Sequence, residues 1–326
     1  MFTLRFDMRA PASGAPAGAL YAAALEMTAW SESRGGVAVI VCEHHGQPDG
    51  YLPAPVVLAG ALAARTASIP IVLAVVVLPL YEPVRLAEEM AVLDLLSGGR
   101  VSYVCAVGYR EDEYDMFGVD FHRRGRIADE WLAVLLQAKT GEPFEHRGRS
   151  IRVTPPPVTP GGPSVSWGGG SAAAARRAAR NGLGFFGQSE DPSLRRAYEE
   201  AAHAAGLEPG SCYLPPRDLP TTLFVADDPD RAWEELGPYL LHDARSYAAM
   251  NEGDTMTTSF SFASSVDELR AEARSHRIVT VEEAVAMVRG GLPLPLHPLV
   301  GGLPPEVAWR YLRTVTDDVV PALAGG

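Results

Sequence analysis

The sequence has few cysteines and no apolar run long enough to cross a membrane. Three cysteines in 326 residues are too few for a disulfide scaffold, and Cys42 and Cys105 lie in apolar segments typical of buried, reduced thiols. The longest apolar run, residues 69–80, contains two prolines and is shorter than the roughly 20 residues of a membrane-spanning helix. The N-terminus carries Arg5 and Asp7 and lacks the apolar segment of a secretion signal. We therefore expect a cytoplasmic protein.

An excess of basic residues is also absent. The chain has 28 basic and 40 acidic residues, with a formal net charge of −12. The electric field of such a chain repels nucleic acids and anionic membrane surfaces, so neither is an expected partner. With 47% hydrophobic residues the chain can bury one large core, and we expect a single domain over residues 1–326. This composition favours an enzyme that acts on a small molecule.

Short apolar runs alternate with helical segments along the whole chain. Parallel strands that are buried on both faces appear as continuous apolar runs of this kind. The expected strands are residues 2–6, 37–42, 71–78, 101–107, 165–167, 184–186, 221–226 and 294–299. The main expected helices are residues 17–34, 56–66, 84–96, 127–138, 172–181, 229–250, 281–288 and 304–322, and residues 141–163 form a proline-rich connection. Eight alternations predict an α/β fold, a (β/α)8 TIM barrel with insertions, although an open doubly wound sheet fits the same pattern.

In such a barrel the functional residues follow the C-terminal ends of the strands. Glu43, His44 and His45 come directly after the second expected strand. Consecutive strand residues point to opposite faces, so these three cannot converge on one ion, and we assign no metal ligands. A histidine at this position suits proton transfer or hydrogen bonding to a developing charge. Both histidines could equally satisfy only backbone groups at the strand end.

Two other strand ends carry candidate residues. Residues 168–171 place a glycine turn and Ser171 before an alanine-rich helix, where backbone N–H groups can bind a phosphate, although simple helix capping also explains them. Tyr109 and Arg110 follow the fourth strand, and Arg110 is chemically suited to a phosphate. Residues 251–276 form a long polar connection, of the length typical of lids or disordered loops.

The order of these motifs resembles the bacterial luciferase-like, flavin-dependent monooxygenases. The motifs are CEHH after the second strand, AVVVLPLYEPVRLAEEMAVLDLLSGGR through the third strand and its helix, GYREDEYDMFGVDF after the fourth, and the glycine-serine turn after the fifth. The resemblance covers nearly the whole chain and is strongest over residues 37–126. It implies a luciferase-like TIM barrel and an oxidoreductase.

The resemblance also assigns roles to residues. His44 matches the family's catalytic histidine, with Glu43 expected to orient it, and Ala74-Val75 matches the place of a non-proline cis peptide under the flavin ring. Residues 251–276 match a mobile active-site loop. The expected catalytic residues are His44 and Glu43, the expected cofactor-binding residues are Ala74, Val75, Val107, Tyr109, Arg110, Gly169, Gly170 and Ser171, and the expected substrate or lid residues are His45, Asn251 and His297.

For function, the resemblance implies a flavoprotein monooxygenase. It would use reduced FMN and O2 to oxygenate a small organic substrate through a flavin 4a-hydroperoxide. A separate reductase would supply the reduced flavin, and the protein would form a homodimer. One alternative is hydride transfer from an 8-hydroxy-5-deazaflavin coenzyme, and another is a non-catalytic flavin-binding protein. The luciferases carry a phosphate-binding arginine at the position of Val107, so here the phosphate would need another partner such as Arg110. Residues 46–49 also differ, so we expect a different substrate.

Overall fold

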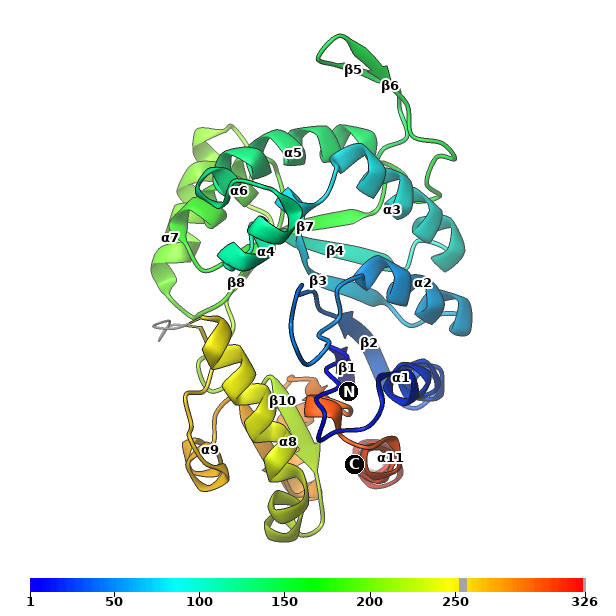
Figure 1. Ribbon diagram of the computed structural model, residues 1–326, viewed down its shortest axis with the longest axis vertical. Helices are drawn as coiled ribbons and strands as arrows, with labels where there is room; N and C mark the ends of the chain where they lie inside the picture. Colours follow the sequence, from blue (N-terminus) through cyan, green and yellow to red (C-terminus); the bar gives the residue numbers. More distant parts are fainter. Residues whose placement is uncertain (252–256, 325–326) are drawn as a thin grey trace. The chain divides into compact units, whose positions relative to one another are not determined.

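Figure 1 shows the computed structural model of the protein, which describes residues 1–251 and 257–324. The chain groups into two compact units, which are described separately. Unit 1 comprises residues 1–40, 47–53 and 217–326, and unit 2 comprises residues 41–46 and 54–216. None of the described helices combines the length and apolar composition of a membrane span.

Unit 1 contains strands in the order β11-β10-β12-β1-β2, and the pairs from β11 to β1 are parallel. Its strands are β1 (Phe2–Phe6), β2 (Gly36–Val41, whose last residue belongs to unit 2), β10 (Thr222–Val225), β11 (His276–Val279) and β12 (Leu294–Leu296). Its helical segments are α1 (Ala17–Glu32), α8 (Pro229–Met250), α9 (Val266–Glu272), α10 (Val281–Arg289), η3 (Val300–Gly302), α11 (Pro305–Thr314), η4 (Val315–Val319) and α12 (Val320–Ala324). Phe2 pairs with Leu294 and Leu4 with Leu296, so β1 and β12 end at the same edge.

Unit 2 contains a parallel sheet in the order β3-β4-β7-β8-β9 and an antiparallel hairpin, β5-β6. Its strands are β3 (Ile71–Val77), β4 (Val101–Ala106), β5 (Phe144–His146), β6 (Arg149–Ile151), β7 (Ser164–Gly169), β8 (Phe185–Gly187) and β9 (Cys212–Tyr213). Its helical segments are α2 (Pro55–Arg65), η1 (Leu78–Leu80), α3 (Pro83–Ser97), α4 (Glu111–Phe117), η2 (Phe121–Arg123), α5 (Arg124–Ala138), α6 (Ala172–Arg180) and α7 (Pro192–Ala204). Figure 1 shows the hairpin projecting away from the rest of this unit.

Helix α3 illustrates why the expected boundaries were accurate. Pro83 occupies the first turn, where its missing N–H costs nothing, and the Glu82 side chain accepts a hydrogen bond from the backbone N–H of Arg85 at 2.8 Å. Gly98 ends the helix with a φ of 63°, a left-handed conformation that glycine adopts without steric cost. Such helix-starting and helix-ending residues act over a few positions, so they can be recognised in the sequence.

All eight expected strands are present, but several elements were missed. The expected proline-rich connection contains the hairpin β5-β6, whose turn residues Arg147 and Gly148 have positive φ without the usual Asn-Gly signature. Helix α7 had a readable start, because Asp191 accepts from the backbone N–H of Ser193 and Pro192 opens the helix. Helices α4 and α9 and strands β9 and β11 were also missed.

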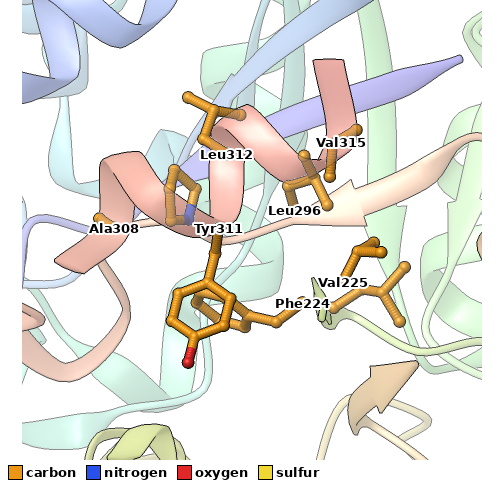
Figure 2. A pocket seen from close by; sticks show the side chains of 9 residues that line it. Phe224, Val225, Leu296, Ala308, Tyr311, Leu312 and Val315 are labelled. Carbon is orange, nitrogen blue, oxygen red and sulfur yellow. The ribbon is translucent and has the colours of Figure 1, made fainter. Parts of the chain in front are cut away.

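The packing of α11 on β10 and β12 leaves little free space. Figure 2 shows Phe224 and Val225 facing Tyr311, Leu312 and neighbouring apolar side chains, and the Phe224 and Tyr311 rings meet edge to face with their centroids 5.7 Å apart. The cavity between them is only about 10 Å³. That volume is about the minimum for one water molecule, so this cavity is not a ligand site.

Candidate functional site

Glu43, His44 and His45 lie just beyond β2, and all three are buried. The strand ends at Val41, so the segment is not extended strand and each side chain takes its own direction. Its hydrogen-bond partners include Tyr81, directly after η1, Glu113 on α4 and Tyr109 in the loop before α4, which belong to unit 2. The segment is therefore held by tertiary contacts rather than by a strand ladder.

The imidazole of His44 is hydrogen-bonded through both nitrogens. Its Nδ1 lies 2.8 Å from Oε1 of Glu113, on α4, and its Nε2 lies 3.1 Å from the Tyr109 hydroxyl. An ionised carboxylate only accepts hydrogen bonds, so Nδ1 donates to Glu113, and Nε2 in this tautomer accepts the Tyr109 hydroxyl. This is the arrangement required of a histidine that accepts or donates a proton at Nε2.

Glu113 was not among the expected site residues. It is only 1% exposed, and the same Oε1 that bonds His44 also accepts the backbone N–H of His45 at 2.9 Å. One carboxylate oxygen therefore fixes both the His44 ring and the backbone that follows it. The signal in the sequence was weak, because Glu113 is one of several acidic residues in GYREDEYD and only its burial distinguishes it.

We expected Glu43 to orient His44, and the hydrogen bonds recorded for Glu43 correct this. Its Oε1 lies 2.9 Å from Nε2 of His45, and its Oε2 accepts the Tyr81 hydroxyl at 2.9 Å. Burial raises the pKa of Glu43, while hydrogen bonds from His45 and Tyr81 oppose the rise. Glu43 thus anchors the segment through His45, and the orienting carboxylate of His44 is Glu113.

Cys105, on β4, is fully buried. Burial, together with the nearby Glu43 carboxylate, raises the pKa of the Cys105 thiol to about 12. Because the thiolate is the reactive form of cysteine, this side chain stays an inert thiol at neutral pH. It belongs to the packing of the site rather than to its chemistry.

The strand ends expected to hold a cofactor have the expected backbone features. The Ala74-Val75 peptide is cis, and Ser171 is the N-cap of α6, its hydroxyl accepting the N–H of Ala174 at 3.2 Å. Close packing accounts for part of the glycine run. A Cβ on Gly169 would lie 2.7 Å from the Cβ of Ala174, and one on Gly170 would lie 2.9 Å from Oε1 of Gln188. The cofactor roles of these residues stay predictions.

The start of α6 fits a phosphate group. Its first turn contains no acidic residue, and backbone N–H groups at a helix N-terminus attract anions. By contrast, Arg110 is hydrogen-bonded to Asp112 and lies 3.9 Å from the Glu113 carboxylate, so two acidic groups already offset its charge. The carbonyl of Val107 accepts the hydroxyl of Tyr114. A phosphate here would depend on the α6 backbone more than on Arg110.

The two expected lid residues, Asn251 and His297, lie in unit 1. Asn251 is the C-cap of α8, whereas His297 is fully buried next to Asp7 at the end of β12. The polar connection expected over residues 251–276 contains α9, and His276 already belongs to β11. Residues 252–256 of that connection lie outside the described part of the chain. The lid roles stay predictions, although burial leaves His297 no exposed surface.

Comparison with known proteins places this geometry in a family. A model described as luciferase-like monooxygenase matches residues 3–285. The alkanal monooxygenase alpha chain of Photorhabdus luminescens is 29% identical over 130 residues, which are 40% of this chain and 36% of that protein. The first three curated relatives are matched over only 36–40% of their own length.

Solved structures show the same fold over the whole chain. The monooxygenase RslO1 from Streptomyces bottropensis superimposes with a TM-score of 0.77, at 22% identity over 99% of both chains. The oxygenating constituent of 3,6-diketocamphane monooxygenase from Pseudomonas putida, solved with FMN, gives 0.66 at 18% identity over 98% of both. An F420-dependent secondary alcohol dehydrogenase gives 0.63 at 16% identity over 91% of this chain and 92% of that one.

These comparisons bear out the expected fold class and the resemblance seen in the motifs. The fold is α/β and corresponds to the luciferase-like TIM barrel. The family match runs through the sequence of both compact units and includes the CEHH segment, the cis peptide and the start of α6. The chain therefore belongs to the luciferase-like monooxygenase family.

Proposed function

We propose that this protein is a monooxygenase that uses reduced FMN and O2 to oxygenate a small organic substrate through a flavin 4a-hydroperoxide. A separate reductase would supply the reduced flavin, and the protein would act as a single domain in the cytoplasm. One observation carries the proposal. His44 is held between the Glu113 carboxylate and the Tyr109 hydroxyl, with Nε2 placed to exchange a proton. The bound flavin would supply the oxygen activation.

The residues of the chain would handle the proton. When Nε2 of His44 takes up a proton, the ring would stay hydrogen-bonded to Glu113 through Nδ1 at 2.8 Å. The Tyr109 hydroxyl, 3.1 Å from Nε2, can both donate and accept and so can pass the proton onward. Glu43 and His45 would keep the segment in place without touching the reacting atoms.

The residues that would hold the flavin come from the middle of β3 and from the turn after β7. Ala74 and Val75 would lie against the ring, and Gly170 and Ser171 with the first N–H groups of α6 would bind its phosphate. The flavin phosphate would then not require an arginine at the position of Val107. A helix N-terminus supplies positive potential, and the absence of acidic residues from the first turn leaves that potential uncancelled.

The test mixes the purified chain anaerobically with photoreduced FMN and then with O2. We expect FMN to bind, and we expect the oxidised-flavin absorbance to recover only after a measurable delay following oxygen uptake. A matched titration uses the 8-hydroxy-5-deazaflavin coenzyme and follows fluorescence quenching. Binding of the deazaflavin without FMN would replace the proposal with the hydride-transfer alternative, which the F420-dependent structural relative favours. Binding of FMN with no delay would favour the non-catalytic alternative.

We also propose a homodimer that forms through α2 and α3. These helices border an open groove of about 260 Å³, which is lined by the charged Arg85, Glu88 and Glu89 and by three exposed apolar side chains: Val57 at 74%, Val92 at 45% and Leu96 at 59%. Exposed apolar groups clustered in this way are typical of protein interfaces. A second copy would cover the same patch on its partner, as in the usual twofold dimer.

Replacing Leu96 with glutamate should convert the dimer to a monomer. The substitution would bury a charge at the centre of the apolar interface, which costs several kcal/mol unless the charge is paired. Light scattering after size-exclusion chromatography gives the mass directly. Leu207→Glu is the control, because Leu207 is 39% exposed and does not line the groove. A wild-type protein that elutes as a monomer, or a Leu96→Glu variant that stays dimeric, would contradict the assignment.

A further inference from the structure

Unit 1 contains a buried group of three metal-ligating side chains that the proposed chemistry does not use. Asp7 follows β1, His297 follows β12, and Asp243 lies on α8, with exposed fractions of 0%, 0% and 1%. The pairing of Leu4 with Leu296 brings the ends of β1 and β12 to the same edge. One ligand atom from each of the three residues lies within 4.8 Å of the others.

Polar atoms of this group are unsatisfied. Nδ1 of His297 and Oδ1 of Asp243 have no hydrogen-bond partner among the described residues. Nε2 of His297 points toward the carboxylates, 3.3 Å from Oδ1 of Asp7. Buried polar groups almost always have a partner, and an unsatisfied one destabilises the folded state. The lone pairs of these nitrogen and oxygen atoms converge on one point. This arrangement suits a cation, which accepts lone pairs.

We propose that Asp7, Asp243 and His297 bind a divalent transition-metal cation. The bonds would come from one oxygen of each carboxylate and from Nε2 of His297. Two ligands that each lie about 2.1 Å from an ion are about 3.0–3.4 Å apart, from right-angle to tetrahedral geometry. The observed 3.3 Å between His297 and Asp7 falls in that interval. Mixed nitrogen and oxygen ligands favour zinc, manganese, iron or cobalt over calcium.

Neighbouring groups orient both carboxylates. Nε2 of His276 lies 2.8 Å from Oδ2 of Asp243, and Nε of Arg9 donates to Oδ2 of Asp7 at 3.1 Å. The backbone N–H of Arg9 also donates to Oδ1 of Asp7 at 3.2 Å, so this oxygen would share its lone pairs between that N–H and the ion.

The buried charges near Arg9 also favour binding of a cation, because acidic groups outnumber basic ones. Asp7, Asp49 and Asp243 are three buried acids around Arg9, and two further histidines, His242 and His276, contact Asp49 and Asp243. Arg5 also acts on Asp243, so the three acids exceed the two arginines by one negative charge, and this excess attracts a cation. Arg9, 3.8 Å from Oδ1 of Asp243, weakens the site compared with one built on free carboxylates. The competing arrangement contains no metal, and the histidines carry the positive charge.

The test uses the full chain, stripped with a chelator, dialysed and titrated with Co²⁺, whose visible d–d absorption reports coordination by protein groups. We expect one Co²⁺ per chain, displaced by Zn²⁺, and at least tenfold weaker binding in Asp243→Asn and in His297→Gln. His45→Gln is the matched control, because His45 is also a buried histidine paired with a carboxylate, and it should bind as wild type does. Equal binding in wild type and both site variants would overturn the proposal.

A second measurement does not depend on whether the variants fold. In the wild-type chain, Co²⁺ should raise the midpoint of thermal unfolding and a chelator should reverse the rise, because a ligand that binds only the native state stabilises it. No visible absorption and no shift of the midpoint in the wild type would establish the metal-free arrangement.

Discussion

Replacing His44 with alanine should shorten the delay between oxygen uptake and recovery of the oxidised-flavin absorbance by about 100-fold or more. General acid–base groups contribute about 10²–10⁴-fold to rates, and His44 contacts both Glu113 and Tyr109 through its two ring nitrogens. Stopped-flow absorbance with a parallel oxygen electrode measures the two events. His122→Gln, an 83% exposed histidine on η2, is the control and should behave as wild type.

Glu113 provides a finer test of the same arrangement. Glu113→Gln keeps the size of the side chain but removes the carboxylate that accepts from Nδ1 of His44, so the delay should shorten toward that of His44→Ala. Glu113→Asp keeps a carboxylate and should restore the delay in part. A purely structural role of Glu113 would change the stability of the protein without changing the delay. Equal delays in wild type and His44→Ala would refute proton transfer by His44.

Replacing Arg9 with methionine should lower the free energy of unfolding by about 3–5 kcal/mol, the usual cost of removing one partner from a buried ion pair. The Arg9 guanidinium is fully buried, with Nε 3.1 Å from Asp7 and Nη1 2.8 Å from Asp49. It also lies 4.7 Å from the ring centroids of Tyr51 and Tyr247, which adds cation–π attraction. Methionine would leave both carboxylates buried without their cation.

Urea unfolding with a chelator present measures this loss apart from any metal contribution. The matched control is Arg126→Met, which removes an exposed i,i+4 pair with Glu130 and should cost less than about 1 kcal/mol. A cost for Arg9→Met as small as that of the control would show that Asp7 and Asp49 do not depend on Arg9.

The same ion pairs give the wild-type protein a defined acid sensitivity. Burial acts against ionisation of Asp49, but hydrogen bonds from His242 and Arg9 lower its pKa to about 2. A carboxylate with a lowered pKa contributes stability that is present above its unfolded value, near pH 4, and is lost as the pH falls through its folded value. The free energy of unfolding of the wild type should therefore fall between about pH 4 and 2, and Arg9→Met should reduce that slope.

Element order and the first candidate residues could be predicted from sequence because their causes are local. Apolar runs marked the eight strands, and Pro83 and Gly98 marked the ends of α3. His44 followed from its place after a buried strand together with the order of the surrounding motifs. Helix α7 could also have been predicted, since Asp191-Pro192 is a readable start.

The partners of these residues depended on the tertiary structure. Within GYREDEYD the sequence offers Glu111, Asp112 and Glu113 on equal terms, and only the packing of α4 buries Glu113 against His44 while its neighbours stay exposed. Likewise, no spacing in the sequence relates Asp7, Asp243 and His297. Their convergence requires β1 to pair with β12 and α8 to pack in the same unit.

By itself, then, the sequence determined the fold class, the strand order along the chain and the presence of a histidine at a strand end. These features depend on hydrophobic periodicity and on helix- and strand-ending residues, which act over a few positions. Only the tertiary structure decided which carboxylate holds that histidine and which buried charges meet around Arg9. Hydrogen bonds and ion pairs form between neighbours in space, and residues far apart in the chain become neighbours only when the strands pair and the helices pack.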